Sequence, residues 1–155
     1  MKRVGAFFFI IAAMLVMGCS KSDNDQKVVN ADPEGTVEMD LATYGFHGQY
    51  EINLADNVSI SLEEDSLTVY RAVVTNIGKV ESLSAIQYVP AVGPWKDGPG
   101  GWERIAVKPK HGYIIRSRDN QVYTRIFVEA LNMGANDKDI IGAHIKFQSP
   151  WMDYK

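Results

Sequence analysis

The sequence has few of the residues that build metal centres or covalent cross-links. Its 155 residues include one cysteine and three histidines, at positions 47, 111 and 144. No two histidines have the spacing of a zinc-binding motif, and one cysteine cannot form a disulfide within the chain. The sequence therefore predicts no metal site, no cofactor, and a folded part that is stabilised by burial of apolar side chains.

Motifs for nucleotide binding and for nucleophilic catalysis are also missing. The sequence contains no GxSxG motif and no phosphate-binding glycine loop. Acidic residues at 63–65 are candidates for the carboxylate pair of a glycosidase, but they fall in a predicted turn. The net charge of −3 argues against a nucleic-acid partner. These absences favour a binding or structural protein over an enzyme and leave a glycan hydrolase as an alternative.

The single cysteine follows the one long apolar run of the sequence. Two basic residues precede the apolar stretch 4–17, and Gly18 and Cys19 follow it. The run is shorter than the roughly 20 residues that cross a bilayer, and it has the length of a signal-peptide core. Residues 16–19, Val-Met-Gly-Cys, resemble the lipobox of bacterial lipoproteins. The resemblance implies cleavage before Cys19 and attachment of a diacylglycerol to its sulfur.

Three segments are expected along the chain. Residues 1–18 are predicted to be a lipoprotein signal peptide, residues 19–34 the lipidated cysteine and a flexible tether, and residues 35–155 a single domain. Cleavage after residue 18 leaves 137 residues, which is enough to bury one core. It also removes two basic residues, so the net charge falls from −3 to −5. We expect the acyl chains, and not the acidic protein surface, to hold the domain at a membrane.

The rest of the sequence has the two-residue alternation of β-strands. Val58, Ile60 and Leu62 alternate with polar residues, and the last third contains three β-type runs that are separated by short turns. No long amphipathic helix pattern occurs after the apolar run. The pattern predicts an all-β fold, an antiparallel β-sandwich, with a small barrel as the alternative.

Four more specific expectations can be tested. Residues 67–74 are predicted to form one buried strand, and residues 80–89 fit a strand or a helical turn, with a strand favoured in their second half. The last strand is expected to end at residues 149–150. Within residues 122–131, even-numbered side chains are expected on one face of a strand and odd-numbered side chains on the other.

A loop rich in glycine and proline spans residues 91–101 and carries Trp95, Lys96 and Asp97, with Trp102 directly after it. Aromatic rings on loops can stack on sugar rings while nearby charged groups bind hydroxyls. We therefore take these four residues as candidates for ligand binding. Trp95 is expected to be exposed, and Trp102 is expected to be a buried support at the edge of the core.

Arginines and histidines allow weaker hypotheses. Arg116, Arg118 and Arg125 are candidates for a small anion site, and the alternative is cross-strand pairing with Glu129 or another acid. His144 is expected to lie at the surface without a metal.

Several stretches of the chain carry a resemblance to other proteins. They are residues 32–37 (DPEGTV), 101–102 (GW), 111–116 (HGYIIR), 123–128 (YTRIFV) and 141–151 (IGAHIKFQSPW). Together they resemble a group of small, functionally uncharacterised outer-membrane lipoproteins. The resemblance implies a β-rich lipoprotein domain of unknown function and transfers no catalytic residue.

The expected function is that of a lipid-anchored domain at the outer membrane, on the cell surface or the periplasmic face. Its expected partners are the membrane, through the lipid, and an extracellular or periplasmic ligand such as a glycan. The alternative is a structural or assembly accessory that packs against another envelope protein. No nucleic acid is expected as a partner.

Overall fold

The computed structural model of the protein describes residues 32–153, except for positions 56, 92–94, 97–100 and 120–121. The candidate residues Cys19 and Asp97 lie outside the described residues. The elements in chain order are β1 (Val37–Ala42), β2 (Glu51–Ala55), β3 (Val58–Glu63), β4 (Ser66–Tyr70), β5 (Ala72–Lys79), the short 3-10 helix η1 (Leu83–Ala85), β6 (Trp102–Ala106), β7 (His111–Ser117), β8 (Val122–Met133) and β9 (Ile140–Asp153).

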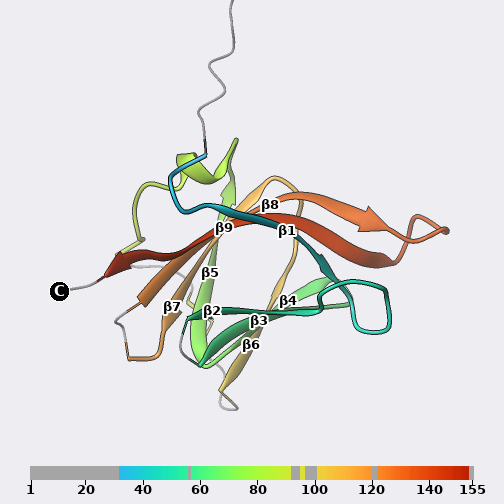
Figure 1. Ribbon diagram of the computed structural model, residues 1–155, viewed down its shortest axis with the longest axis horizontal. Helices are drawn as coiled ribbons and strands as arrows, with labels where there is room; N and C mark the ends of the chain where they lie inside the picture. Colours follow the sequence, from blue (N-terminus) through green and yellow to red (C-terminus); the bar gives the residue numbers. More distant parts are fainter. Residues whose placement is uncertain (1–31, 56, 92–94, 97–100, 120–121, 154–155) are drawn as a thin grey trace, which may run out of the picture.

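The strands form two antiparallel sheets that pack against each other (Figure 1). The larger sheet has the order β1-β9-β8-β7-β5, and the smaller sheet has the order β2-β3-β4-β6. The sheets do not close into a barrel, so the predicted β-sandwich is confirmed. The described residues contain no helix with the length and hydrophobicity needed to span a bilayer.

The last third of the chain builds the centre of the larger sheet. β7, β8 and β9 are consecutive antiparallel neighbours, as the three alternating runs of the sequence predict. β8 has 12 residues and β9 has 14, and β1 and β5 pair with the outer edges of this meander. The strands that precede the meander supply the two edges and the opposing sheet.

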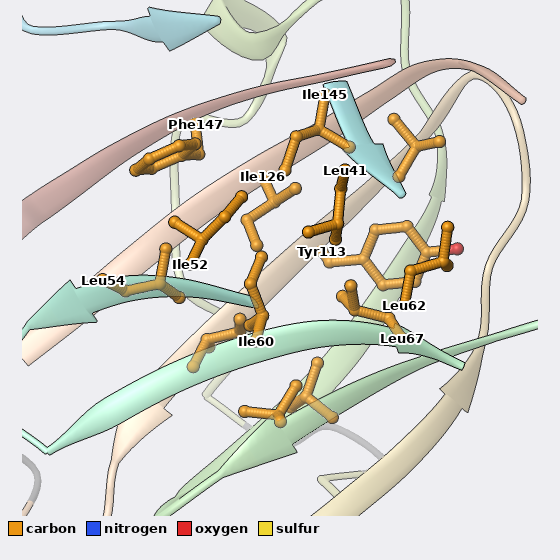
Figure 2. Close-up of a cluster of buried hydrophobic side chains, with 14 of the residues drawn as sticks. Leu41, Ile52, Leu54, Ile60, Leu62, Leu67, Tyr113, Ile126, Ile145 and Phe147 are labelled. Atoms are coloured by element: carbon orange, nitrogen blue, oxygen red, sulfur yellow. The ribbon is translucent and has the colours of Figure 1, made fainter. Parts of the chain in front are cut away.

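A single apolar cluster fills the space between the two sheets (Figure 2). Ile52 and Ile60 reach into it from the smaller sheet and meet Ile126 and Ile145 of the larger sheet. Ile60, Ile126 and Ile145 have no exposed surface. Burying a side chain of this size contributes about 1.5–3 kcal/mol, so this cluster holds the sandwich together.

The predicted single strand over residues 67–74 is wrong, because the chain changes sheets in its middle. β4 ends at Tyr70, β5 begins at Ala72, and Arg71 between them has a φ of 57°. This left-handed conformation turns the chain from the smaller sheet into the larger one. Apolar residues on both sides of the break reach the same core, which explains their continuous hydrophobic pattern.

Residues 83–85 form η1 and residues 86–89 belong to no strand, so the strand expected in the second half of residues 80–89 is wrong. Leu83 and Ile86 are buried against the outer face of the larger sheet, where they form a second apolar cluster with Ile114, Tyr123 and Phe127. Their three-residue spacing therefore reflects a helical turn that covers part of this face.

Arg125 fastens this covering turn to the sheet. Its guanidinium donates to the carbonyl oxygen of Ile86 at 2.6 Å and of Leu83 at 3.4 Å. It also donates two hydrogen bonds to the Gln148 side-chain oxygen, at 2.9 and 2.7 Å. Burial lowers the pKa of Arg125 below its usual value. These contacts give Arg125 a structural role and overturn the hypothesis that it belongs to an anion site.

A β-bulge changes the predicted faces of β8. Ile126 and Val128 point into the main core as expected, but the register with β9 shifts between Val128 and Ala130. Leu131 therefore packs against the main core and Ala130 is exposed, which reverses the predicted alternation beyond the bulge. β9 itself continues past residue 150 to Asp153, so the expected strand end there is wrong.

The folded part begins slightly earlier than the expected residue 35. Asp32 pairs with the Lys146 ammonium group at 2.9 Å, and the carbonyl oxygen of Glu34 accepts a hydrogen bond from the Gln148 side chain at 2.9 Å. Both partners lie on β9, so the last residues of the expected tether are attached to the larger sheet.

Candidate functional site

A groove opens where the β1–β2 loop, the β3–β4 turn and the β8–β9 loop come together. Its volume is about 950 Å³. The residues that line it are Thr43, Tyr44, Phe46, Tyr50, Glu51, Ser61, Leu62, Glu63, Glu64, Asp65, Tyr70, Lys138, Asp139 and Ile140. Both sheets contribute to the groove, because β2, β3, β4 and the start of β9 form its walls.

Hydrogen bonds to β9 and two glycines fix the conformation of the β1–β2 loop. Thr43 donates from both its backbone nitrogen and its hydroxyl to the carbonyl oxygen of Ile141, at 3.0 and 3.2 Å. Gly45 and Gly48 have φ values of 91° and 138°, and a Cβ at Gly48 would lie 2.9 Å from the Cβ of Ala42. The loop conformation therefore requires glycine at these two positions.

Three aromatic side chains of this part of the chain face solvent. Tyr44 is 82% exposed, Phe46 is 53% exposed and Tyr50 is 53% exposed. The rings of Tyr44 and Tyr50 meet edge to face, with centroids 5.9 Å apart and planes at 86°. Large exposed aromatic rings that share one groove are typical of a binding surface.

Carboxylates at the groove are positioned by neighbouring side chains. Ser59 donates a hydrogen bond to the Glu51 carboxylate at 2.7 Å. The hydroxyl of Tyr70 donates to one oxygen of Glu63 at 3.1 Å, and Arg104 forms an ion pair with the other oxygen. Because both oxygens are engaged, Glu63 is a fixed hydrogen-bond acceptor at the rim.

The groove carries a strong excess of negative charge. Its acidic lining residues are Glu51, Glu63, Glu64, Asp65 and Asp139. Of the described residues that line it, only Lys138 is a cation. This balance repels anionic ligands and suits neutral or positively charged ones.

The two tryptophans have the opposite of their predicted positions. Trp102 begins β6, is 48% exposed, and lies directly opposite Tyr70 in the register of β4 and β6. Trp95 is half-buried and packs against the second apolar cluster, with the Arg116 guanidinium 4.6 Å from its ring centroid. Strand alternation sends Glu103 inward beside Trp102, so the ring of Trp102 faces outward.

The predicted ligand-binding candidates that the structure describes, Trp95, Lys96 and Trp102, do not converge on one site. Trp95 lies on the outer face of the larger sheet, whereas Trp102 lies on the outer face of the smaller one. Lys96 forms an isolated backbone bridge with Val74 of β5, and its side chain is exposed. Of these three described candidates, Trp102 alone comes near the groove, through its neighbour Tyr70.

One segment of the sequence could have predicted the groove. Residues 44–50, YGFHGQY, combine three aromatic residues with two glycines. The two glycines predict a turn, and in the structure this turn leaves the three aromatic side chains outside the core. The sequence identifies the acidic turn at 63–65 only as a candidate carboxylate pair, because it does not show that this turn faces the loop.

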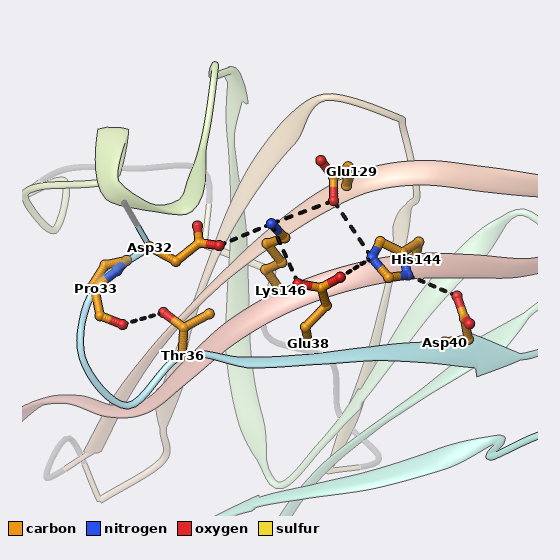
Figure 3. Close-up of polar contacts among 8 residues, drawn as sticks. All are labelled: Asp32, Pro33, Thr36, Glu38, Asp40, Glu129, His144 and Lys146. Atoms are coloured by element: carbon orange, nitrogen blue, oxygen red, sulfur yellow. Dashed lines mark hydrogen bonds and ion pairs between the residues drawn. The ribbon is translucent and has the colours of Figure 1, made fainter. Parts of the chain in front are cut away.

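A second polar cluster lies on the outer face of the larger sheet (Figure 3). The two ring nitrogens of His144 lie 2.9 Å from Asp40 and 2.9 Å from Glu38, and Glu129 lies 3.5 Å away. The hydrogen bond to Asp40 raises the pKa of His144, burial opposes this shift, and Glu38 adds to it. Lys146 joins the cluster, and its hydrogen bond to Asp32 raises its own pKa.

Comparisons with known proteins do not assign a family. Protein-family models, curated proteins and solved structures were compared with the chain, and none of them matches. The class that the fold and the site define is an antiparallel β-sandwich with an aromatic, acidic groove between its loops.

Proposed function

We propose that the protein is a carbohydrate-binding domain of the bacterial envelope, held at the outer membrane by a lipid on Cys19. Its binding site is the groove that contains the β1–β2 loop. The observation that carries the proposal is the grouping of exposed Tyr44, Phe46 and Tyr50 with fixed carboxylates in one groove. The lipobox resemblance of residues 16–19 supports the anchor.

The groove offers the two kinds of contact that a sugar needs. A pyranose ring has an apolar C–H face and a rim of hydroxyl groups. The exposed rings of Tyr44 and Tyr50 supply surfaces for the C–H face, and Glu51 and Glu63 supply acceptors for the hydroxyls. Small-molecule pockets measure roughly 300–1,000 Å³, so a groove of about 950 Å³ accommodates several sugar units.

The charge of the groove narrows the class of glycan. Five carboxylates and one lysine line the groove, and Arg104 beside it neutralises Glu63 alone, so a polymer of uronic acids or sulfated sugars meets electrostatic repulsion. Neutral glycans are not repelled by the carboxylates, and glycans with protonated amino groups are attracted to them. The proposed ligand is therefore a neutral or amino-bearing polysaccharide.

The position of the groove suits a ligand that approaches from outside the membrane. The described chain begins at Asp32 near η1, whereas the β1–β2 loop lies at another side of the sandwich (Figure 1). Residues 19–31 can span at most about 45 Å, since an extended chain covers up to about 3.5 Å per residue. An anchor at Cys19 therefore leaves the groove room to reach a polymer.

The test is a binding panel of neutral, amino-bearing and uronic-acid oligosaccharides, measured by isothermal titration calorimetry. Tyr44→Ala and Phe46→Ala are expected to weaken binding of the best ligand at least tenfold, which corresponds to about 1.4 kcal/mol for each ring. Tyr88→Ala is the matched control, because Tyr88 is 75% exposed but does not line the groove. Equal affinities in all three variants, or preference for uronic acids, would contradict the proposal.

A second candidate function is that of an accessory that packs against another envelope protein. The same exposed rings, Tyr44, Phe46 and Tyr50, favour it, because aromatic residues are enriched at protein interfaces. The binding panel separates the two functions. A protein that binds no oligosaccharide, yet loses cross-linking to an envelope partner when Tyr44 is replaced by alanine, is an accessory.

A further inference from the structure

Four ionisable side chains from three neighbouring strands meet on the outer face of the larger sheet, away from the groove (Figure 3). Glu38 and Asp40 come from β1, Glu129 from β8 and His144 from β9. The imidazole lies at the centre, so the cluster combines a nitrogen ligand with several carboxylates.

The distances suit a single bound ion. His144 Nε2 lies 2.9 Å from Glu38 Oε1 and 3.5 Å from Glu129 Oε2, and the three donor atoms all lie within 4.8 Å of one another. A tetrahedral ion with ligands at about 2.1 Å separates its donor atoms by about 3.4 Å. The Glu38 side chain is half-exposed, so it is free to rotate toward this separation.

Asp40 orients the imidazole for this role. His144 Nδ1 lies 2.9 Å from Asp40 Oδ1 and can donate its hydrogen to that oxygen. Nε2 lies at hydrogen-bond distance from Glu38, so its lone pair becomes a ligand when an ion replaces the hydrogen on this nitrogen. Histidines that bind metals commonly donate their second ring nitrogen to a carboxylate, which fixes the ring and makes it a stronger ligand.

The backbone places the ligands on rigid elements. Asp40 lies directly opposite His144 in the register of β1 and β9. Glu129 follows the core-facing Val128 on β8, so strand alternation places its side chain on the same outer face as His144. No sequence motif marks the site, because Glu38 and His144 are 106 positions apart.

The local charge favours a divalent cation. Asp32, Glu38, Asp40 and Glu129 contribute four carboxylates, and Lys146 is the cation among them. The Lys146 ammonium group lies nearer to Asp32, at 2.9 Å, than to Glu38 at 3.5 Å or Glu129 at 3.7 Å. Lys146 thus pairs with three of the four carboxylates, and with a neutral His144 the cluster keeps a net charge of −3 (four carboxylates and one ammonium), which attracts a cation.

We propose that Glu38, Glu129 and His144 bind a divalent transition-metal ion of the zinc type, with Asp40 as the positioning residue. One imidazole and two carboxylates match zinc better than calcium, which takes oxygen ligands alone. Three protein ligands leave one coordination position for water or a ligand. The ion joins the edge strand β1 to β8 and β9, so it stabilises the larger sheet.

The test measures Zn²⁺ binding to the full-length protein in detergent, after treatment with a chelator, by calorimetry and thermal unfolding. Wild-type protein is expected to bind one Zn²⁺ and to unfold several degrees higher, and the chelator should reverse the shift. His144→Gln and Glu129→Gln are expected to weaken Zn²⁺ binding at least tenfold. His47→Gln and His111→Gln are matched controls that keep it, because neither residue touches the cluster.

The Asp40→Asn variant tests whether Asp40 positions the imidazole without changing the fold or the proposed ligands. It leaves all three proposed ligands in place and should weaken Zn²⁺ binding with an unchanged circular dichroism spectrum. The proposal is overturned if the wild-type protein binds no Zn²⁺, or if His144→Gln binds it as tightly as the wild type. It is also overturned if a control histidine proves to be the ligand, since the carboxylates and the imidazole then form only an ion-pair network.

Discussion

Replacement of Arg125 by methionine tests how the outer face of the larger sheet is covered. The guanidinium connects β8 to the turn at Leu83 and Ile86 and to Gln148 of β9, and the residue is 7% exposed. Methionine keeps an unbranched apolar stem of similar length, so Arg125→Met removes the hydrogen bonds with little loss of packing. The apolar cluster around Leu83 stays intact in this design.

The expected loss of stability follows from the acceptors that remain without a donor. The Ile86 carbonyl loses a bond of 2.6 Å and the Gln148 oxygen loses two, of 2.9 and 2.7 Å. A buried acceptor without a partner costs about 1–3 kcal/mol. Gln148 is partly exposed and can bind water, and removal of a buried charge offsets part of the loss. The net destabilisation is therefore expected to be about 2–4 kcal/mol.

Urea unfolding, followed by circular dichroism, measures this difference. Arg71→Met is the control, because Arg71 is exposed and its side chain donates a hydrogen bond to Asn57 at 2.8 Å. It should change the free energy of unfolding by no more than about 0.5 kcal/mol. Hydrogen exchange of the amides at residues 83–86 should speed up in Arg125→Met alone. Equal stability of the two variants would refute the structural role of Arg125.

Three further predictions concern other parts of the chain. Tyr113→Phe should destabilise the protein by about 1–2 kcal/mol in urea unfolding, because the buried hydroxyl, whose pKa is raised to about 12 by burial, bonds to the backbone of the β6–β7 turn at 2.8 and 2.9 Å. A smaller loss than that of an exposed Tyr→Phe control would contradict it. The pKa of His111 is lowered by burial and by Lys108 and Lys79, so the folded state binds fewer protons than the unfolded state. Its contribution to stability is present above the unfolded pKa of about 6.5 and is lost as the pH falls from there through the lower pKa of the folded state. His111→Gln should therefore lose less stability than the wild type between pH 7 and 5, and a steeper loss in the variant would contradict this prediction. Cys19→Ala should abolish incorporation of radiolabelled palmitate in cells, and equal labelling would exclude lipidation of Cys19.

The strands were largely predictable, because alternation of polar and apolar residues reports one buried face directly. The pattern of Val58 to Leu62 corresponds to β3, and the three runs of the last third correspond to β7, β8 and β9. The pattern does not predict where the chain crosses from one sheet to the other when the residues on both sides of the crossing are equally buried. The crossing at Arg71 lies between two runs that enter the same core, so hydrophobicity alone joined them into one strand.

The sites were less predictable because they depend on which segments meet. Trp95 and Trp102 are close in sequence, yet they lie on the outer faces of different sheets. The groove needs loop 43–50, the turn at 63–65 and residues 138–140 to converge, and the outer cluster needs β1, β8 and β9 to pair side by side. Long-range register decides both, and a local sequence pattern does not contain it.

The most direct test of the central claim is nuclear magnetic resonance mapping of the protein during titration with the tightest-binding oligosaccharide of the panel. The account predicts that chemical-shift changes concentrate in residues 43–51, 63–65 and 138–140, which line the groove. The indole of Trp95, which packs on the outer face of the larger sheet, should not respond. Shifts that concentrate around Trp95, or no saturable shift with any glycan, would contradict the claim that the groove binds carbohydrate.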